Sequence, residues 1–174
     1  MKSFKLPFGL GRLLHTRDNG SAILLAGHEF SSNLRATITR ASGDIEDIDL
    51  GSGLVTTAGV NLMATDYSNA NATLKIENYH DSGTGTTAAT IADTGLQTPT
   101  GNARVAGTQS NPSAGQYRTV ATLAYTASAA ITEWGLFSAS TAGTMWDHKV
   151  FSALNVQNGD SITFTYTLTV TAGG

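Results

Sequence analysis

The chain contains no cysteine, so neither a disulfide framework nor a thiolate metal site can form among its 174 residues. Charged residues make up only 13% of the sequence, about half of the ~25% that is typical. No window approaches the roughly 20 consecutive apolar residues that a membrane-spanning helix needs. Gly9 and Gly11 interrupt the only N-terminal stretch that a secretion signal could occupy. We therefore expect a soluble, unexported protein with no membrane partner, stabilised by packing, β-ladder hydrogen bonds or association with other chains.

Glycine is abundant instead, with 19 residues, and threonine, serine and alanine fill much of the remainder. Such a composition is typical of β-rich proteins with many turns. The clearest pattern lies near the C-terminus, where hydroxyl and apolar residues alternate strictly from Ser161 to Val170. A period of two puts the apolar side chains on one face and the hydroxyls on the other. The pattern predicts a half-buried antiparallel strand that begins after the Asn158-Gly159-Asp160 turn.

Other segments rich in strand-forming residues are separated by short clusters of turn residues. The predicted strands cover residues 22–26, 34–40, 54–64, 73–79, 117–126, 131–137 and 145–152. The last four strands of the chain are expected to form a meander, and no window of 11 residues shows a convincing helical stripe. We predict an all-β fold, a jelly-roll-like antiparallel β-sandwich of about eight or nine strands.

Two segments differ from the predicted sandwich. Residues 1–20 are expected to form an extended N-terminal arm, and residues 21–174 a single domain. Residues 1–40 hold six Lys/Arg and two Asp/Glu, a balance of +4, whereas the remainder hold four and eleven, a balance of −7. The arm either packs on its own domain or docks on a neighbouring subunit, which makes Phe4, Phe8 and Leu10 interface candidates. The Gly/Thr-rich stretch 80–116 is expected to be a long loop, either a contact surface or a floppy excursion.

The residue types that perform catalysis or bind metals do not gather into a recognisable motif. In the couples His80-Asp81 and Asp147-His148, neighbours on a strand point to opposite faces, so neither couple chelates one ion easily. The acidic stretch 44–49 lacks the spacing of a calcium loop and is interpreted as a solvated strand or hairpin. The sequence also lacks a basic cluster interleaved with aromatic residues, so we expect no nucleic-acid partner. We predict no metal and no cofactor.

Glu133 is the one carboxylate within an otherwise apolar predicted strand. Burial would raise its pKa and make it a candidate general acid. No second carboxylate stands at a readable spacing, so we interpret Glu133 as exposed, or as hydrogen-bonded in a subunit contact. A hydrolase using Glu133 and Asp147 would need two carboxylates at catalytic separation. We predict that the protein is not an enzyme.

Several short segments resemble a pattern of small virion proteins of tailed bacteriophages. They are ITEWGLF at 131–137, GTM at 143–145, FSA at 151–153, NGDSITFTYTLTV at 158–170, GTGTTAA at 83–89 and DTGL at 93–96. Together they span roughly residues 80–170, about half of the chain. The ITE-x-GLF element is shared with tail-fibre and baseplate proteins, so it indicates a phage particle more specifically than it indicates a part of one.

Within a phage particle, the small size, the absence of recognisable sites and the arm-plus-sandwich layout favour a capsid decoration or cement protein. We expect a homotrimer that binds the major capsid protein and copies of itself. Its expected location is the virion, after synthesis in the cytoplasm of the host bacterium. The alternative is a tail-fibre, baseplate or receptor-binding module that recognises host surface glycan. Trp134 and Trp146 are interface candidates in either case, and both could equally belong to the core.

Overall fold

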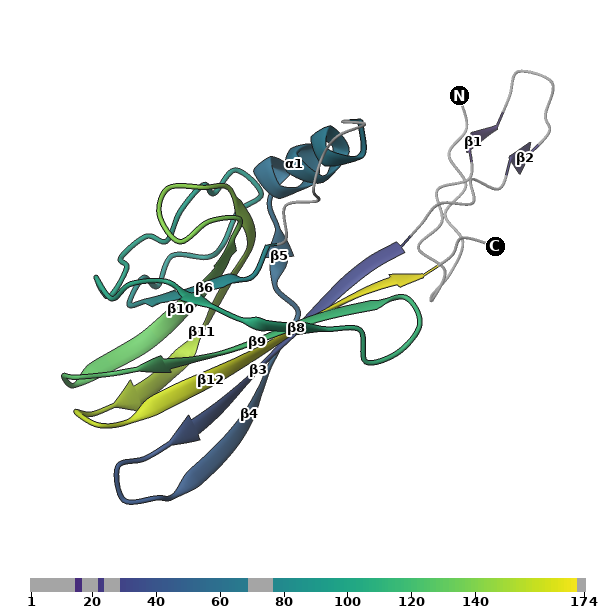
Figure 1. Cartoon of the computed structure of the whole chain (residues 1–174). Coiled ribbons are helices and arrows are strands. Elements are labelled where there is room, and N and C mark those ends of the chain that lie inside the picture. The colour runs from purple at the N-terminus through teal and green to yellow at the C-terminus, as the bar shows by residue number, and fades with distance from the viewer. Residues whose placement is uncertain (1–14, 17–21, 24–28, 69–76, 172–174) are drawn as a thin grey trace.

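The chain folds into a sandwich of two antiparallel β-sheets (Figure 1). The computed structural model describes residues 15–16, 22–23, 29–68 and 77–171. The sheet that we call the β10 sheet has five strands in the spatial order β5 (Leu54–Val55), β11 (Met145–Val156), β10 (Ala129–Phe137), β6 (Tyr79–Gly83) and β7 (Val105–Ala106). The β12 sheet has the order β4 (Ile45–Gly51), β3 (Glu29–Thr39), β12 (Ser161–Thr171), β9 (Gln116–Ala124) and β8 (Thr108–Ser110). The prediction of an all-β antiparallel sandwich is confirmed.

Within the described residues, twelve strands occur, more than the predicted eight or nine. The difference arises because four strands, β1 (His15–Thr16), β2 (Ala22–Ile23), β5 and β7, are only two residues long. β1 and β2 pair with each other in a separate small sheet. The remainder of the predicted arm and of the predicted strands 22–26 and 73–79 lies largely outside the described residues.

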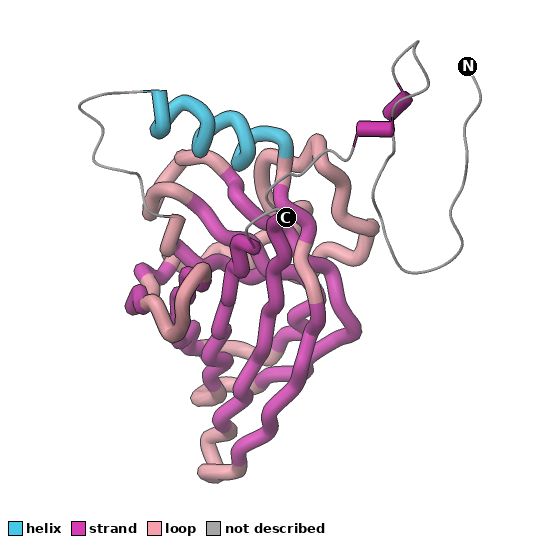
Figure 2. Tube along the Cα trace, turned by 90° about the vertical axis from the view of Figure 1, so that its right-hand side faces the viewer, coloured by secondary structure: helices cyan, strands magenta, loops and turns pink. Residues whose placement is uncertain are grey.

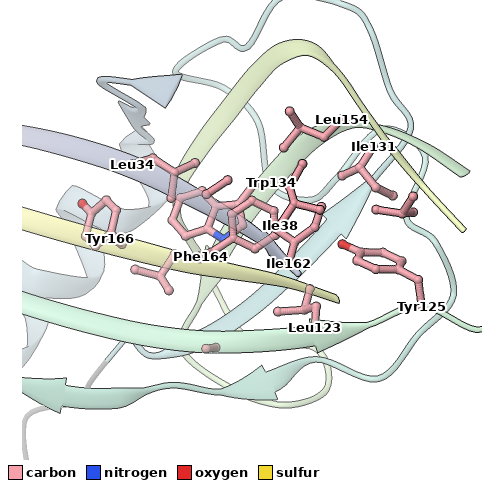
Figure 3. Packing of buried hydrophobic residues seen from close by; sticks show 14 of the residues in the cluster. Leu34, Ile38, Leu123, Tyr125, Ile131, Trp134, Leu154, Ile162, Phe164 and Tyr166 are labelled. Atoms are coloured by element: carbon pink, nitrogen blue, oxygen red, sulfur yellow. The ribbon is translucent and has the colours of Figure 1, made fainter. Parts of the chain in front are cut away.

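Strand β12 is the central strand of its sheet, and it is half-buried and antiparallel, as its alternation predicts. It pairs with β3 along its whole length and with β9 on the other side. Its apolar residues Phe164 and Tyr166 are fully buried and pack against Trp134 of the opposite sheet (Figure 3). Its threonines lie on the outer face of the β12 sheet. The core is therefore the layer between the two sheets.

The predicted four-stranded meander is wrong. β10 and β11 do form a hairpin-like pair, but β9 and β12 pair with each other in the opposite sheet. The chain therefore crosses the core twice, between β9 and β10 and between β11 and β12. Both crossings bring apolar faces together, because each sheet can bury its apolar side only against the other.

Residues 57–68 form a helix, α1 (Thr57–Ser68), where the sequence predicted part of a strand. Thr56 caps it, since its Oγ1 accepts a hydrogen bond from the Gly59 N–H at 3.0 Å. The helix lies across one end of the strands (Figure 2). At Gly59 a Cβ would come within 2.8 Å of the Trp146 carbonyl oxygen, so glycine allows this close approach. The run of apolar residues at 54–64 is typical of either a strand or a helix, and the cap at Thr56 favours the helix.

The stretch 80–116 is not one loop. It contains most of β6 together with β7 and β8, so strands of both sheets come from a segment with few large apolar residues. The longest remaining part, residues 84–104, is named here the clasped loop. It lies against the outer face of the β10 sheet, where Leu96 packs beside Gly135. The β10 sheet is thus covered on both faces, whereas the outer face of the β12 sheet has no such layer among the described residues.

Candidate functional site

The most unusual group in the structure is the carboxylate of Glu133, which is fully buried on the loop side of strand β10. Its Oε1 accepts backbone hydrogen bonds from Gly85 at 3.0 Å and from Thr98 at 2.7 Å. Its Oε2 accepts a third from Gln97 at 2.9 Å. The interpretation of Glu133 as exposed or in a subunit contact is wrong, because the clasped loop of the same chain folds over it and supplies its donors.

His148 on β11 extends this arrangement. The imidazole is fully buried, with Nε2 3.2 Å from Oε2 of Glu133 and Nδ1 2.7 Å from Oδ2 of Asp93. Asp93 lies in the clasped loop and also accepts hydrogen bonds from the N–H and the hydroxyl of Thr90. Partial burial raises the pKa of Asp93, but the hydrogen bonds from Thr90 and His148 outweigh it and hold that pKa below its ordinary value. We call Asp93, His148 and Glu133 the carboxylate clasp.

A second attachment holds the other end of the clasped loop. The Arg104 guanidinium lies 3.3 Å from the Asp81 carboxylate and 3.4 Å from the centroid of the Phe137 ring. It also donates to the carbonyl of Ala139 at 3.1 Å. Burial raises the pKa of Asp81, and hydrogen bonds from Ser82 and Arg104 only partly offset this effect. The loop is therefore fixed near both of its ends by charged groups.

Two further polar chains cross the core itself. Trp134 donates from Nε1 to Nδ1 of His80 at 3.2 Å, so the proton of the neutral ring is on Nε2, which lies 3.1 Å from the Thr119 hydroxyl. Burial lowers the pKa of His80 to about 3. Because the ring is neutral at ordinary pH, it occupies the core as a polar but uncharged group.

The second chain joins the sheets through Asp147. Tyr166 donates its hydroxyl proton to Oδ2 of Asp147 at 3.1 Å and accepts from Nε1 of Trp146 at 2.9 Å. Burial raises the pKa of Asp147 to about 6, against hydrogen bonds that lower it. The prediction that the adjacent residues of His80-Asp81 and Asp147-His148 point to opposite faces is confirmed. His80 and Asp147 face the core, and Asp81 and His148 face the loop.

None of the residues predicted as interface candidates is found on the surface of the described structure. Trp134 and Trp146 are 0% and 4% exposed and pack between the sheets, so the core alternative holds for both. Phe4, Phe8 and Leu10 lie outside the described residues. The acidic stretch 44–49 forms most of the exposed edge strand β4, which confirms the interpretation of a solvated strand.

Chemically, the carboxylate clasp is built to hold the loop. Glu133 receives three backbone donors and one imidazole donor, which occupy all the lone-pair directions of its two oxygens. Glu133 and Asp147 face opposite sides of the β10 sheet, so they do not flank a common substrate position. Over the described ranges, three or more His, Asp or Glu side chains are nowhere grouped to hold a metal ion. Helix α1, the helix that the structure describes, is too short and too polar to cross a membrane.

The clasp leaves no space at Gly83, which pairs with Glu133 across β6 and β10. A Cβ there would lie 2.3 Å from Oε1 of Glu133 and 2.4 Å from the Thr98 carbonyl oxygen. We expect Gly83→Ala to lower the free energy of unfolding by about 2–3 kcal/mol, because backbone as well as side chain must move. Urea denaturation measures this loss. Gly95→Ala is the control, since nothing lies within 4 Å of its Cβ position, and a loss at Gly83 no larger than that at Gly95 would contradict the packing argument.

Sequence reasoning missed the clasp because its three members come from a loop and two strands that are far apart in the chain. The available signal was the motif ITE-x-GLF itself: a charged residue within an apolar strand needs a partner. Comparisons with protein-family models, with curated proteins and with solved structures found no match to this chain.

Proposed function

We propose that this chain is a structural protein of a tailed-phage particle, acting as a capsid decoration or cement protein. The proposal rests first on the resemblance of residues 80–170 to small virion proteins. The structure adds a physical role for the shared ITE-x-GLF element on β10. Ile131 and Leu136 enter the core, Thr132 and Glu133 bind the clasped loop, and Gly135 makes room for Leu96. Such an element builds a scaffold, which is what an assembly protein requires.

The observation that best supports an assembly role is the contrast between the two outer faces. The β10 sheet is covered by the clasped loop, whereas the outer face of the β12 sheet presents hydroxyl groups. Its members include Thr37, Thr122, Thr163, Thr165, Thr167 and Thr169. β-Branched threonines lose little side-chain entropy on contact. Charged residues on the same face are already hydrogen-bonded to these threonines, Arg118 to Thr167 and Asp47 to Thr37. We propose this face as a contact surface for the major capsid protein or for other copies in a homotrimer.

The alternative, a tail module that recognises glycan, calls for exposed aromatic rings that stack on sugars. Both tryptophans of the chain, Trp134 and Trp146, are buried and so do not present such a ring. The decoration role needs no such ring, so the structure favours it. Copy number separates the two: a decoration protein is present in numbers comparable with the major capsid protein, and a tail module in far fewer copies.

The contact surface is tested by adding a charge to it. Thr122 is exposed on the outer face of β9 opposite Thr163 of β12, so Thr122→Glu is accommodated in the isolated fold and has no cation directly opposite it. We expect binding to particles that lack the protein to weaken about tenfold, since an unpartnered charge in a contact costs at least ~1.4 kcal/mol. Quantitative mass spectrometry of purified particles gives the occupancy. Thr141→Glu, at an exposed position in the loop between β10 and β11, is the control, and equal occupancy of the two variants would refute the surface.

A further inference from the structure

The structure holds two fully buried histidines with different surroundings. His80 has a tryptophan N–H on one nitrogen and a hydroxyl on the other, an arrangement that suits a neutral ring. His148 has a carboxylate oxygen on each nitrogen, at 2.7 and 3.2 Å. A carboxylate is only an acceptor, and a neutral imidazole has one N–H to donate. While Asp93 and Glu133 are both ionised, both hydrogen bonds are made together only when His148 carries two ring protons.

The alternative, in which Glu133 is protonated and His148 neutral, conflicts with the other ligands of Glu133. Three backbone N–H groups point at its oxygens, at 2.7 to 3.0 Å. Such donors stabilise the carboxylate form and disfavour the acid. A buried anion of this kind needs a nearby cation. His148 is the only group within hydrogen-bond distance of Glu133, in the part of the chain that the structure describes, that can provide the positive charge.

We propose that the clasped loop, residues 84–104, is a proton-operated latch. Docking of the loop on the β10 sheet requires the second proton on His148, and loss of that proton frees the loop. Loss of the proton leaves two carboxylates around one N–H. The unprotonated ring nitrogen of His148 then points its lone pair at a carboxylate oxygen, so one hydrogen bond of the clasp is replaced by repulsion. By linkage, docking is then strongest where His148 is charged and weakens as the pH rises.

The groups that face the His148 ring determine the working range of the latch. Asp93 from the loop and Glu133 from β10 bind the ring directly. On its own strand, Asp147 adds a negative charge that interacts with His148. Lys149 donates to the Ser52 carbonyl and adds a positive one. The facing segments 52–54 and 86–89 carry no charged side chain. At acid pH the limit is protonation of Asp93, whose pKa is held below its ordinary value.

A route for proton exchange is present beside the ring. A cavity of about 370 Å³ is lined by Gly53, Leu54, Thr86, Ala88, His148 and Lys149, among others. It opens between the clasped loop and the segment that precedes β5. The cavity borders the clasp, and the His148 side chain is 0% exposed, so proton exchange there requires only a small opening of the loop. His148 bonds to Asp93 and Glu133 on the loop side of the β10 sheet, so the latch involves the loop and not the core between the sheets.

The latch is tested on the full chain by NMR. Nitrogen-15 spectra of the histidine rings report whether each ring nitrogen is protonated, and amide hydrogen exchange at Gly85, Gln97 and Thr98 reports loop docking. We expect both nitrogens of His148 to be protonated while the loop is docked, and one nitrogen of His80. As the pH rises, exchange of the loop amides, corrected for the intrinsic rate, should increase roughly tenfold or more in step with deprotonation of His148. Amides of β12 should not follow.

Variants separate the latch from simple packing. In His148→Gln the side chain has no charge at any pH, so the loop amides should exchange rapidly throughout and lose their pH dependence. His80→Gln, at the other buried histidine, should leave the pH dependence of the loop unchanged. A docked loop whose His148 carries one ring proton would overturn the proposal, as would loop exchange in wild type that does not change when His148 titrates. Should His148→Gln fail to fold, the wild-type spectra still decide the question.

Discussion

Glu133→Ala is expected to lower the free energy of unfolding by about 3–5 kcal/mol, since removing one member of a buried pair leaves the other charge uncompensated. Three backbone N–H groups of the clasped loop lose their acceptor at the same time. The loop should undock before the sandwich unfolds, because the core between the sheets does not include Glu133. Urea denaturation gives the loss of stability, and amide exchange at Gln97 and Thr98 gives the loss of docking.

Two comparison variants isolate the cause. Glu133→Gln keeps the volume and one acceptor oxygen but places an amino group towards the Gln97 N–H or His148, so its loss should be intermediate. Glu46→Ala removes a carboxylate from the exposed strand β4, where the side chain is 56% exposed and pairs with Arg40 at 3.5 Å. Its effect should stay within about 1 kcal/mol. A Glu133→Ala protein as stable as Glu46→Ala would show that the buried carboxylate does not hold the loop.

The second large effect is a pH dependence of opposite sign at two ionisable groups of the core, His80 and Asp147. For His80 the pKa is about 3 in the folded chain and about 6.5 in the unfolded chain. Below pH 6.5 the unfolded chain binds a proton that the folded chain does not, so stability is full above pH 6.5 and is lost towards pH 3. The whole range corresponds to about 5 kcal/mol, and the part from pH 7 to pH 4 to about 3 kcal/mol.

Asp147 acts in the other direction. Its pKa is about 6 when folded, against the ordinary value of 3.8. The folded chain keeps a proton that the unfolded chain has lost, so stability falls by about 3 kcal/mol as the pH rises from 4 to 6. Unfolding curves in urea between pH 4 and pH 7 measure both. Relative to wild type, His80→Gln should gain stability as the pH falls and Asp147→Asn as the pH rises. Parallel curves for all three proteins would exclude both shifts.

The sequence predicted the long strands, but it did not predict helix α1 or the docked loop 84–104 that pack against them. The alternation in 161–170 led directly to β12, and the runs at 117–126, 131–137 and 145–152 led to β9, β10 and β11. It missed helix α1, whose start depends on a hydrogen bond from Gly59 to Thr56 and on an approach to Trp146. The first is a local cap and the second is a tertiary contact, and hydrophobic periodicity reports neither.

The candidate site was predicted least well. Glu133 was recognised as unusual, but its role depends on Gly85, Gln97 and Thr98, which are 35 to 48 residues away in the chain. Composition predicted a long loop at 80–116, either a contact surface or a floppy excursion, because the segment has few large apolar residues. In the structure, charged groups hold the loop instead of apolar ones. Asp93 of the loop bonds to His148, and Arg104 of the loop pairs with Asp81.

By itself the sequence determined the fold class and the identity of the central strands, because a two-residue period specifies which side chains share a face regardless of context. Only the tertiary structure decided which strands pair, which face of each sheet is covered and what Glu133 and His148 do. Those outcomes depend on contacts between distant segments, whose partners a one-dimensional pattern does not name. A buried charge is stable only when such partners surround it, and so its function is read from the folded chain.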